Sequence, residues 1–124
     1  MKSKAGLVVL VATLAALGAM PTAARGGDIF VTSGNAIGEY TTSGATVNDA
    51  MITRLDGPQG LAESGGNLFV ANNNNGTVGE YTTLGATVNA SLITGLNGPQ
   101  GIIVSGGNLF VTNYPAGFGN GTIA

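Results

Sequence analysis

The chain has 124 residues, of which 44% are hydrophobic and only 8% are charged, with a formal net charge of −2 at pH 7. It contains 22 glycines and no histidine or cysteine. This composition excludes catalytic triads that need histidine or cysteine, disulfide bonds and a zinc site built from the usual ligands. Four basic residues are too few to neutralise a phosphate backbone, so nucleic acid is not an expected partner.

Residues 1–24 have the three regions of a secretory signal peptide. Two lysines precede an uncharged run over residues 5–20, and the small residues 22–24 provide a cleavage site after Ala24. The alternative is a membrane anchor, but 16 residues fall short of the roughly 20 that span a bilayer. We expect a signal helix that is removed, which leaves a secreted, periplasmic or cell-surface protein without a membrane anchor.

The remaining chain repeats itself with a period of 41 residues. Three segments recur at this distance: 55–60 as 96–101, 38–42 as 79–83, and 66–70 as 107–111. An earlier copy of the last segment, 27–31, precedes its partner by only 39 residues, because the loop at 72–76 is two residues longer than its counterpart. Near-identity outside a loop of variable length indicates duplication of one structural unit.

The complete copy contains four predicted strands with turn residues between them. The strands are expected at Gly60–Ser64, Asn67–Asn72, Thr77–Thr83 and Ala86–Thr94, with a tight hairpin at Gly65–Gly66. Four antiparallel strands in 41 residues correspond to one blade of a β-propeller. A β-solenoid is the competing repeat architecture, but its coils of about 20–30 residues and its short repeat signature are absent.

The second strand of this unit is apolar on both faces. Leu68 and Val70 point one way, while Phe69 and Ala71 point the other way. A half-exposed sheet would alternate apolar with polar residues, whereas stacked sheets bury both faces of their middle strands. The pattern therefore predicts a stack.

The order of these motifs resembles NHL-type and related repeats of six- or seven-bladed propellers. The motifs are Gly-Pro-Gln-Gly-Ile, then Ser-Gly-Gly-Asn-Leu-Phe-Val-Thr-Asn, then Gly-Thr-Ile, and the resemblance covers residues 26–124. It implies a fold and not an activity, because such propellers serve enzymes, binding proteins and structural proteins. Asn72 and Asn113 stand where the family often has aspartate, so an acidic ligand is not carried over.

We therefore expect an all-β chain of about two and a half blades after the signal segment. The predicted blades are 25–56, which lacks its inner strand, 57–97, and the truncated 98–124. A closed propeller needs at least four blades. The expectation is a fragment of a longer protein, and the alternative is a ring assembled by self-association through open blade faces.

The candidate ligand site is the loop after the last complete strand. It is four residues longer than its counterpart and carries two aromatic residues. Loops of variable length on a repeat scaffold often carry binding. The residues proposed for this site are Asn113, Tyr114, Phe118 and Asn120.

Two other features have simpler interpretations. Glu39 and Glu80 recur at one blade position and could form a ring of carboxylates for calcium, but solvated glutamates near the blade edge are the preferred interpretation. Asn72–Asn75 is interpreted as a plain turn, because asparagine before glycine suits a positive-φ corner.

The sequence predicts an exported, non-enzymatic repeat scaffold with no cofactor, no metal site and no catalytic residue. Its expected partner is a protein or a carbohydrate. The alternative is a fragment of an enzyme of the propeller lyase or lactonase type, whose catalytic residues lie in blades outside this chain. A structural surface array is a third interpretation.

Overall fold

The structure is a computed structural model that describes residues 8–12, 28–114 and 122–123. All the regular secondary structure in these ranges is β-strand, which confirms the predicted all-β class. No helix in the same ranges has the length and hydropathy needed to span a bilayer. The strands are β1 (Val8–Ala12), β2 (Asp28–Ser33), β3 (Ala36–Tyr40), β4 (Thr46–Ile52), β5 (Pro58–Ser64), β6 (Asn67–Asn72), β7 (Thr77–Thr82), β8 (Thr87–Ile93), β9 (Pro99–Ser105), β10 (Asn108–Asn113) and β11 (Thr122–Ile123).

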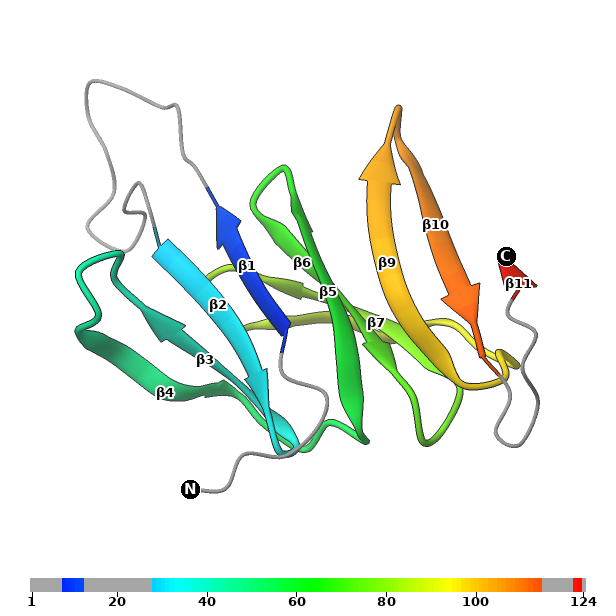
Figure 1. Cartoon of the computed structure of the whole chain (residues 1–124), viewed down its shortest axis with the longest axis horizontal. Coiled ribbons are helices and arrows are strands. Elements are labelled where there is room, and N and C mark those ends of the chain that lie inside the picture. The colour runs from blue at the N-terminus through cyan, green and yellow to red at the C-terminus, as the bar shows by residue number, and fades with distance from the viewer. Residues whose placement is uncertain (1–7, 13–27, 115–121, 124) are drawn as a thin grey trace.

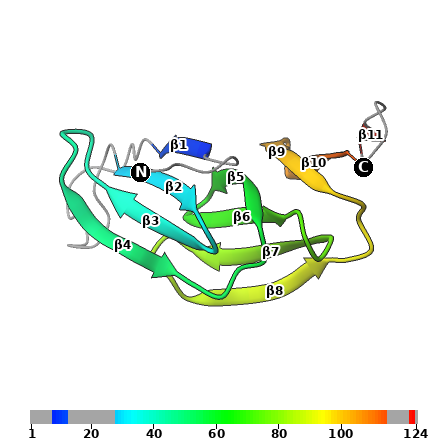
Figure 2. The ribbon, with the colours of Figure 1, turned by 60° about the horizontal axis from the view of Figure 1, so that its bottom comes forward.

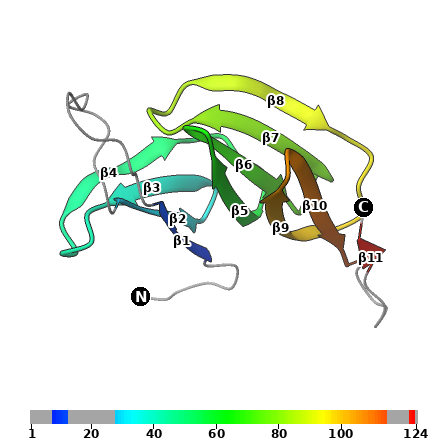
Figure 3. The same cartoon turned by 90° about the horizontal axis from the view of Figure 1, so that it is seen from above.

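The described strands form three antiparallel sheets in which consecutive strands are neighbours. Sheet 1 contains β1 to β4, sheet 2 contains β5 to β8, and sheet 3 contains β9 to β11. The sheets follow one another along the molecule (Figure 1). Strand β5 contacts both β1 and β9, so the first strands of the three sheets lie side by side, while β4 and β8 lie on the far side (Figure 3).

Sheet 2 is the complete repeat unit that the sequence predicts. Strand β6 has the predicted bounds, and β5, β7 and β8 differ from theirs by one or two residues. Gly65 and Gly66 have φ values of 62° and 82°, and Ser64 pairs with Asn67 across them. This is the tight two-residue hairpin expected from two consecutive glycines.

One expectation for the N-terminal part is corrected. Val8–Ala12, within the run expected to be helical, forms β1 and pairs with β2 from Val8↔Thr32 to Ala12↔Asp28. Sheet 1 therefore has four strands, of which β2 to β4 lie within the predicted unit 25–56 and β1 precedes it. Three of the five β1 residues are valines, whose β-branched side chains favour strands. The edge of β2 offers backbone groups that an added strand satisfies.

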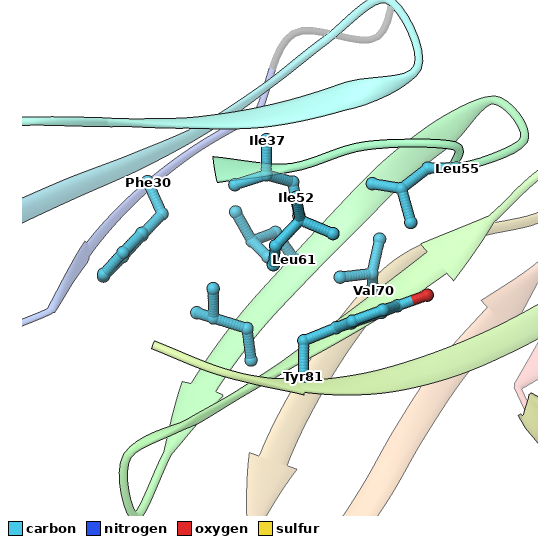
Figure 4. Packing of buried hydrophobic residues seen from close by; sticks show 8 residues of the cluster. Phe30, Ile37, Ile52, Leu55, Leu61, Val70 and Tyr81 are labelled. Carbon is cyan, nitrogen blue, oxygen red and sulfur yellow. The ribbon is translucent and has the colours of Figure 1, made fainter. Parts of the chain in front are cut away.

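The first hydrophobic core lies between sheets 1 and 2. Sheet 1 and the connection after it supply four of its buried residues, and sheet 2 supplies the other four. Their side chains point toward one another in the space between the sheets (Figure 4). The members are Phe30, Ile37, Ile52, Leu55, Leu61, Leu68, Val70 and Tyr81.

The second hydrophobic core lies between sheets 2 and 3. Ala71 belongs to it, with Phe69 packed against it, whereas Leu68 and Val70 belong to the first core. Strand β6 is therefore covered on both faces, as its sequence predicts. The buried members are Ala62, Ala71, Val78, Ile102 and Val111, and the half-buried residues packed on them are Phe69, Ile93, Leu96, Val104 and Leu109.

The repeated Gly-Glu-Tyr motif is explained by the packing of its tyrosine. The Tyr81 ring folds over Gly79, where an added Cβ would come within 2.7 Å of the Tyr81 hydroxyl oxygen. The same arrangement occurs in sheet 1, where a Cβ on Gly38 would come within 2.9 Å of the Tyr40 ring. A residue without a side chain is needed at this position, because the ring occupies the space above it.

Replacing Leu68 by alanine should destabilise the protein by about 2–5 kcal/mol, since a fully buried leucine leaves a cavity that the two sheets fill only in part. Urea unfolding followed by circular dichroism would measure the loss. Leu84→Ala is the matched control, because Leu84 is exposed in the β7–β8 turn and its loss should change the stability by less than about 0.5 kcal/mol. Equal effects of the two substitutions would contradict the described core.

Burial raises the pKa of the Tyr81 hydroxyl above its ordinary value. The folded state then disfavours the phenolate, so stability is complete below the ordinary tyrosine pKa of about 10 and falls as the pH rises above it. In Tyr81→Phe the thermal midpoint should fall less steeply above about pH 10 than in the wild type. Tyr114→Phe, at an exposed position, is the control. Identical pH profiles for Tyr81→Phe and the wild type would rule out this role.

Candidate functional site

A pocket of about 470 Å³ lies at the junction of sheets 2 and 3. The β6–β7 turn (residues 73–76), the β8–β9 connection (residues 96–98), β9 and the residue after β10 form its walls. Figure 2 shows the β8–β9 connection as it returns from the outer side of sheet 2 to sheet 3. The lining residues are Asn73, Asn74, Asn75, Gly76, Leu96, Asn97, Gly98, Gln100 and Tyr114.

The β6–β7 turn is fastened to loops on both sides of sheet 2. The backbone N–H groups of Asn73 and Asn74 donate to the carbonyl oxygens of Gly57 and Asp56, over 2.8 and 3.2 Å. The Asn73 Nδ2 donates to the Pro99 carbonyl oxygen at 3.1 Å. The Asn74 Nδ2 donates to the Asp56 carboxylate at 3.2 Å. The turn therefore joins the connection that enters sheet 2 to the first residue of sheet 3.

These bonds fix the amides of the turn and leave part of each for a ligand. The Asn75 Oδ1 accepts a hydrogen bond from the Thr77 hydroxyl at 2.8 Å. Among the described residues, the Oδ1 atoms of Asn73 and Asn74 and the Nδ2 atom of Asn75 take part in none of these bonds. A carboxamide presents both donors and acceptors. The pocket thus has oriented polar groups and no charged side chain in its lining.

Two of the four proposed ligand residues lie in the described part of the chain. Tyr114 lines the pocket with 44% of its surface exposed, and its N–H donates to the Gly98 carbonyl oxygen at 2.9 Å. Asn113 is buried, and its Oδ1 accepts from the Asn97 N–H at 3.3 Å. Asn113 therefore positions the connection that lines the pocket. Phe118 and Asn120 lie outside the described residues.

Asn72 has the same role one repeat earlier. Its Oδ1 accepts from the Asp56 N–H at 3.3 Å, and its Nδ2 donates to the Thr77 hydroxyl at 3.2 Å. A buried carboxamide can hold a loop N–H without burying a charge. The asparagines at this repeat position thus connect the end of a strand to the loop that enters its sheet.

The recurring glutamates Glu39 and Glu80 lie on separate sheets, in β3 and β7. Glu80 accepts a hydrogen bond from the Asn67 Nδ2 at 2.7 Å. Glu39 is buried, which corrects the expectation of a solvated glutamate. Among the described residues, no three histidine, cysteine, aspartate or glutamate side chains are grouped so that they could hold a metal ion.

The amides of the β6–β7 turn are not among the ligand residues predicted from the sequence. The sequence predicts a plain turn at Asn72–Asn75, and residues 73–76 do form a turn, with Gly76 at a φ of 72°. Three of these turn residues also line the pocket. The available signal was the two-residue length difference between this loop and its counterpart in the first repeat.

No family model matches the chain, and no curated protein matches its sequence. Membership of the NHL-type repeats therefore stays a prediction from the motifs.

Replacing Asn113 by alanine should destabilise the protein by about 1–3 kcal/mol, because the Asn97 N–H loses its acceptor. Chemical unfolding would measure this change. Gln100→Ala removes an exposed amide from the same pocket and should leave the stability unchanged. An Asn113→Ala protein as stable as the wild type would show that the hydrogen bond does not hold the loop.

Proposed function

We propose that this chain is a non-catalytic repeat scaffold that binds a neutral, hydroxyl-rich ligand, of the carbohydrate class, in the pocket between sheets 2 and 3. The observation that carries the proposal is the lining of the pocket. Five of its nine residues carry carboxamides, and none carries a charge.

Hydroxyl groups both donate and accept hydrogen bonds, and so do carboxamides. The amides of Asn73, Asn74 and Asn75 are held by bonds to neighbouring groups before any ligand arrives. A ligand that meets fixed groups does not bear the entropic cost of ordering them. A ligand with several hydroxyls suits this site better than a phosphate or a carboxylate, which would need a cationic partner.

Tyr114 supplies the apolar part of the proposed site. Its exposed side chain borders the same pocket as the amides. An aromatic ring offers a flat apolar face with a polar hydroxyl at its edge. A sugar ring, which has apolar C–H groups on its faces and hydroxyls at its rim, fits that combination.

The chemistry of the lining supports binding without catalysis. Carboxamides are hydrogen-bonding groups that do not exchange protons near neutral pH, so they cannot act as a general acid or base. The whole chain contains no histidine or cysteine. The Asp56 carboxylate lies next to the turn but is not part of the pocket lining, and it accepts a hydrogen bond from the Asn74 Nδ2.

The proposal includes a propeller-type architecture and export from the cell. Antiparallel sheets stacked face to face, with their first strands side by side, support the propeller arrangement. The charge and hydropathy of residues 1–24 support export. A binding scaffold outside the cell would meet carbohydrates of cell surfaces and matrices.

We expect a panel of neutral and acidic oligosaccharides, tested by isothermal titration calorimetry, to contain neutral sugars that bind the wild type. Tyr114→Ala should weaken their binding by about three- to tenfold, since one aromatic contact is worth about 0.5–1.5 kcal/mol. Leu84 is exposed and is not among the residues that line the pocket, so Leu84→Ala should bind as the wild type does. Binding of acidic sugars alone, or no loss in Tyr114→Ala, would contradict the proposal.

A further inference from the structure

The outer face of sheet 3 repeats a face that is buried elsewhere in the molecule. Ile103 and Phe110 are 61% and 42% exposed on the described surface. The residues 41 positions earlier, Ala62 and Phe69, belong to or pack on the second core, where sheet 2 contacts sheet 3. Sheet 3 thus exposes the face with which sheet 2 binds its neighbour.

The outer face of sheet 1 corresponds to the other face of sheet 2, the one that packs against the preceding sheet. Ile29 and Val31 of β2 are half-buried. Their counterparts in sheet 2, Leu68 and Val70, are fully buried in the first core. Sheet 1 thus presents the face with which sheet 2 binds the sheet before it. Sheets 1 and 3 lie at the two ends of the row of sheets in Figure 1.

A second observation comes from the glycines at which the first strands of neighbouring sheets approach one another. Gly60 of β5 lies against β9, and a Cβ on Gly60 would collide with the Gln100 carbonyl oxygen. Its counterpart in β9 is Gly101. Among the described residues, a Cβ on Gly101 would meet only the Thr112 side chain, at 3.1 Å. Within one copy, this glycine leaves room for a side chain of its own sheet and not for a strand of another sheet, whereas a strand docked on β9 would use it for close packing.

We propose that the outer face of sheet 3 binds the outer face of sheet 1 in a second copy of this chain. The contact continues the two interfaces that already join sheets 1, 2 and 3. It is head-to-tail, so it closes a ring when the rotation from sheet to sheet permits. Two copies with three sheets each give six sheets, a number within the range of closed propellers.

Size-exclusion chromatography with light scattering on the full chain tests this inference. The wild type, produced as the full chain with residues 1–24 retained, is expected at twice the 12.2 kDa of one chain. Ile103→Asp places a charge in the proposed contact and should yield single chains with an unchanged circular dichroism spectrum, since Ile103 is exposed within one copy. Leu84→Asp is the control, because Leu84 is equally exposed but lies in the β7–β8 turn, and it should remain dimeric.

Gly101→Ala provides a second variant with a minimal change. It should raise the dimer dissociation constant by roughly tenfold or more, because the added methyl group keeps the docked strand away. Val31→Asp damages the opposite half of the interface, and mixing it with Ile103→Asp should restore a pair with one intact contact. A monomeric wild type, an open-ended polymer, or Ile103→Asp and Gly101→Ala proteins that dimerise like the wild type would overturn the proposal.

Discussion

Strand β6 of sheet 2 is covered on both of its faces, and the arrangement of the other elements depends on this packing. Leu68 and Val70 fill the first core, while Ala71 and Phe69 face the second. A strand that is apolar on both faces leaves one face in contact with water if only one sheet packs on it. Each sheet that contains such a strand therefore needs a neighbouring sheet on both sides. The absence of a side chain at Gly60 lets the inner strands approach closely enough to complete the second contact.

The pocket is a consequence of the same stacking. Each connection between sheets must run from an outer strand to the next inner strand, and it passes the β6–β7 turn at the junction of sheets 2 and 3. Asn72 and Asn113 hold these connections through their buried amides. The polar groups of the site are therefore carried by loops, but their positions are set by a rigid sheet stack.

One repeated residue shows how strongly position in the stack decides environment. Phe30 in sheet 1 is 2% exposed, Phe69 in sheet 2 is half-buried, and Phe110 in sheet 3 is 42% exposed. Their local sequences are nearly the same, as are their places in the second strand of each unit. Among the described residues, another sheet packs against Phe30 and Phe69, whereas none packs against Phe110. Repeat units of this kind obtain much of their stability from such neighbour contacts.

The local structure of this chain is predictable from its amino-acid sequence. Glycine pairs define hairpins, the 41-residue period defines the unit, and the apolar pattern of Leu68 to Ala71 predicts burial on two sides. These features were predictable because turn conformation and strand pattern depend on neighbouring residues. The length of its loop also predicted Tyr114 as a ligand residue, and Tyr114 lines the pocket.

The way in which distant segments meet depends on the tertiary fold. Val8–Ala12 forms a strand because the edge of β2 is there to pair with it, although the apolar run around it predicts a helix. Asn73, Asn97 and Gln100 come to one pocket because two connections and a turn converge at the junction of two sheets. Glu39 is buried, although its sequence context suggests an exposed edge. Such outcomes depend on contacts between residues far apart in the chain, and a local sequence pattern does not specify which distant residues will meet.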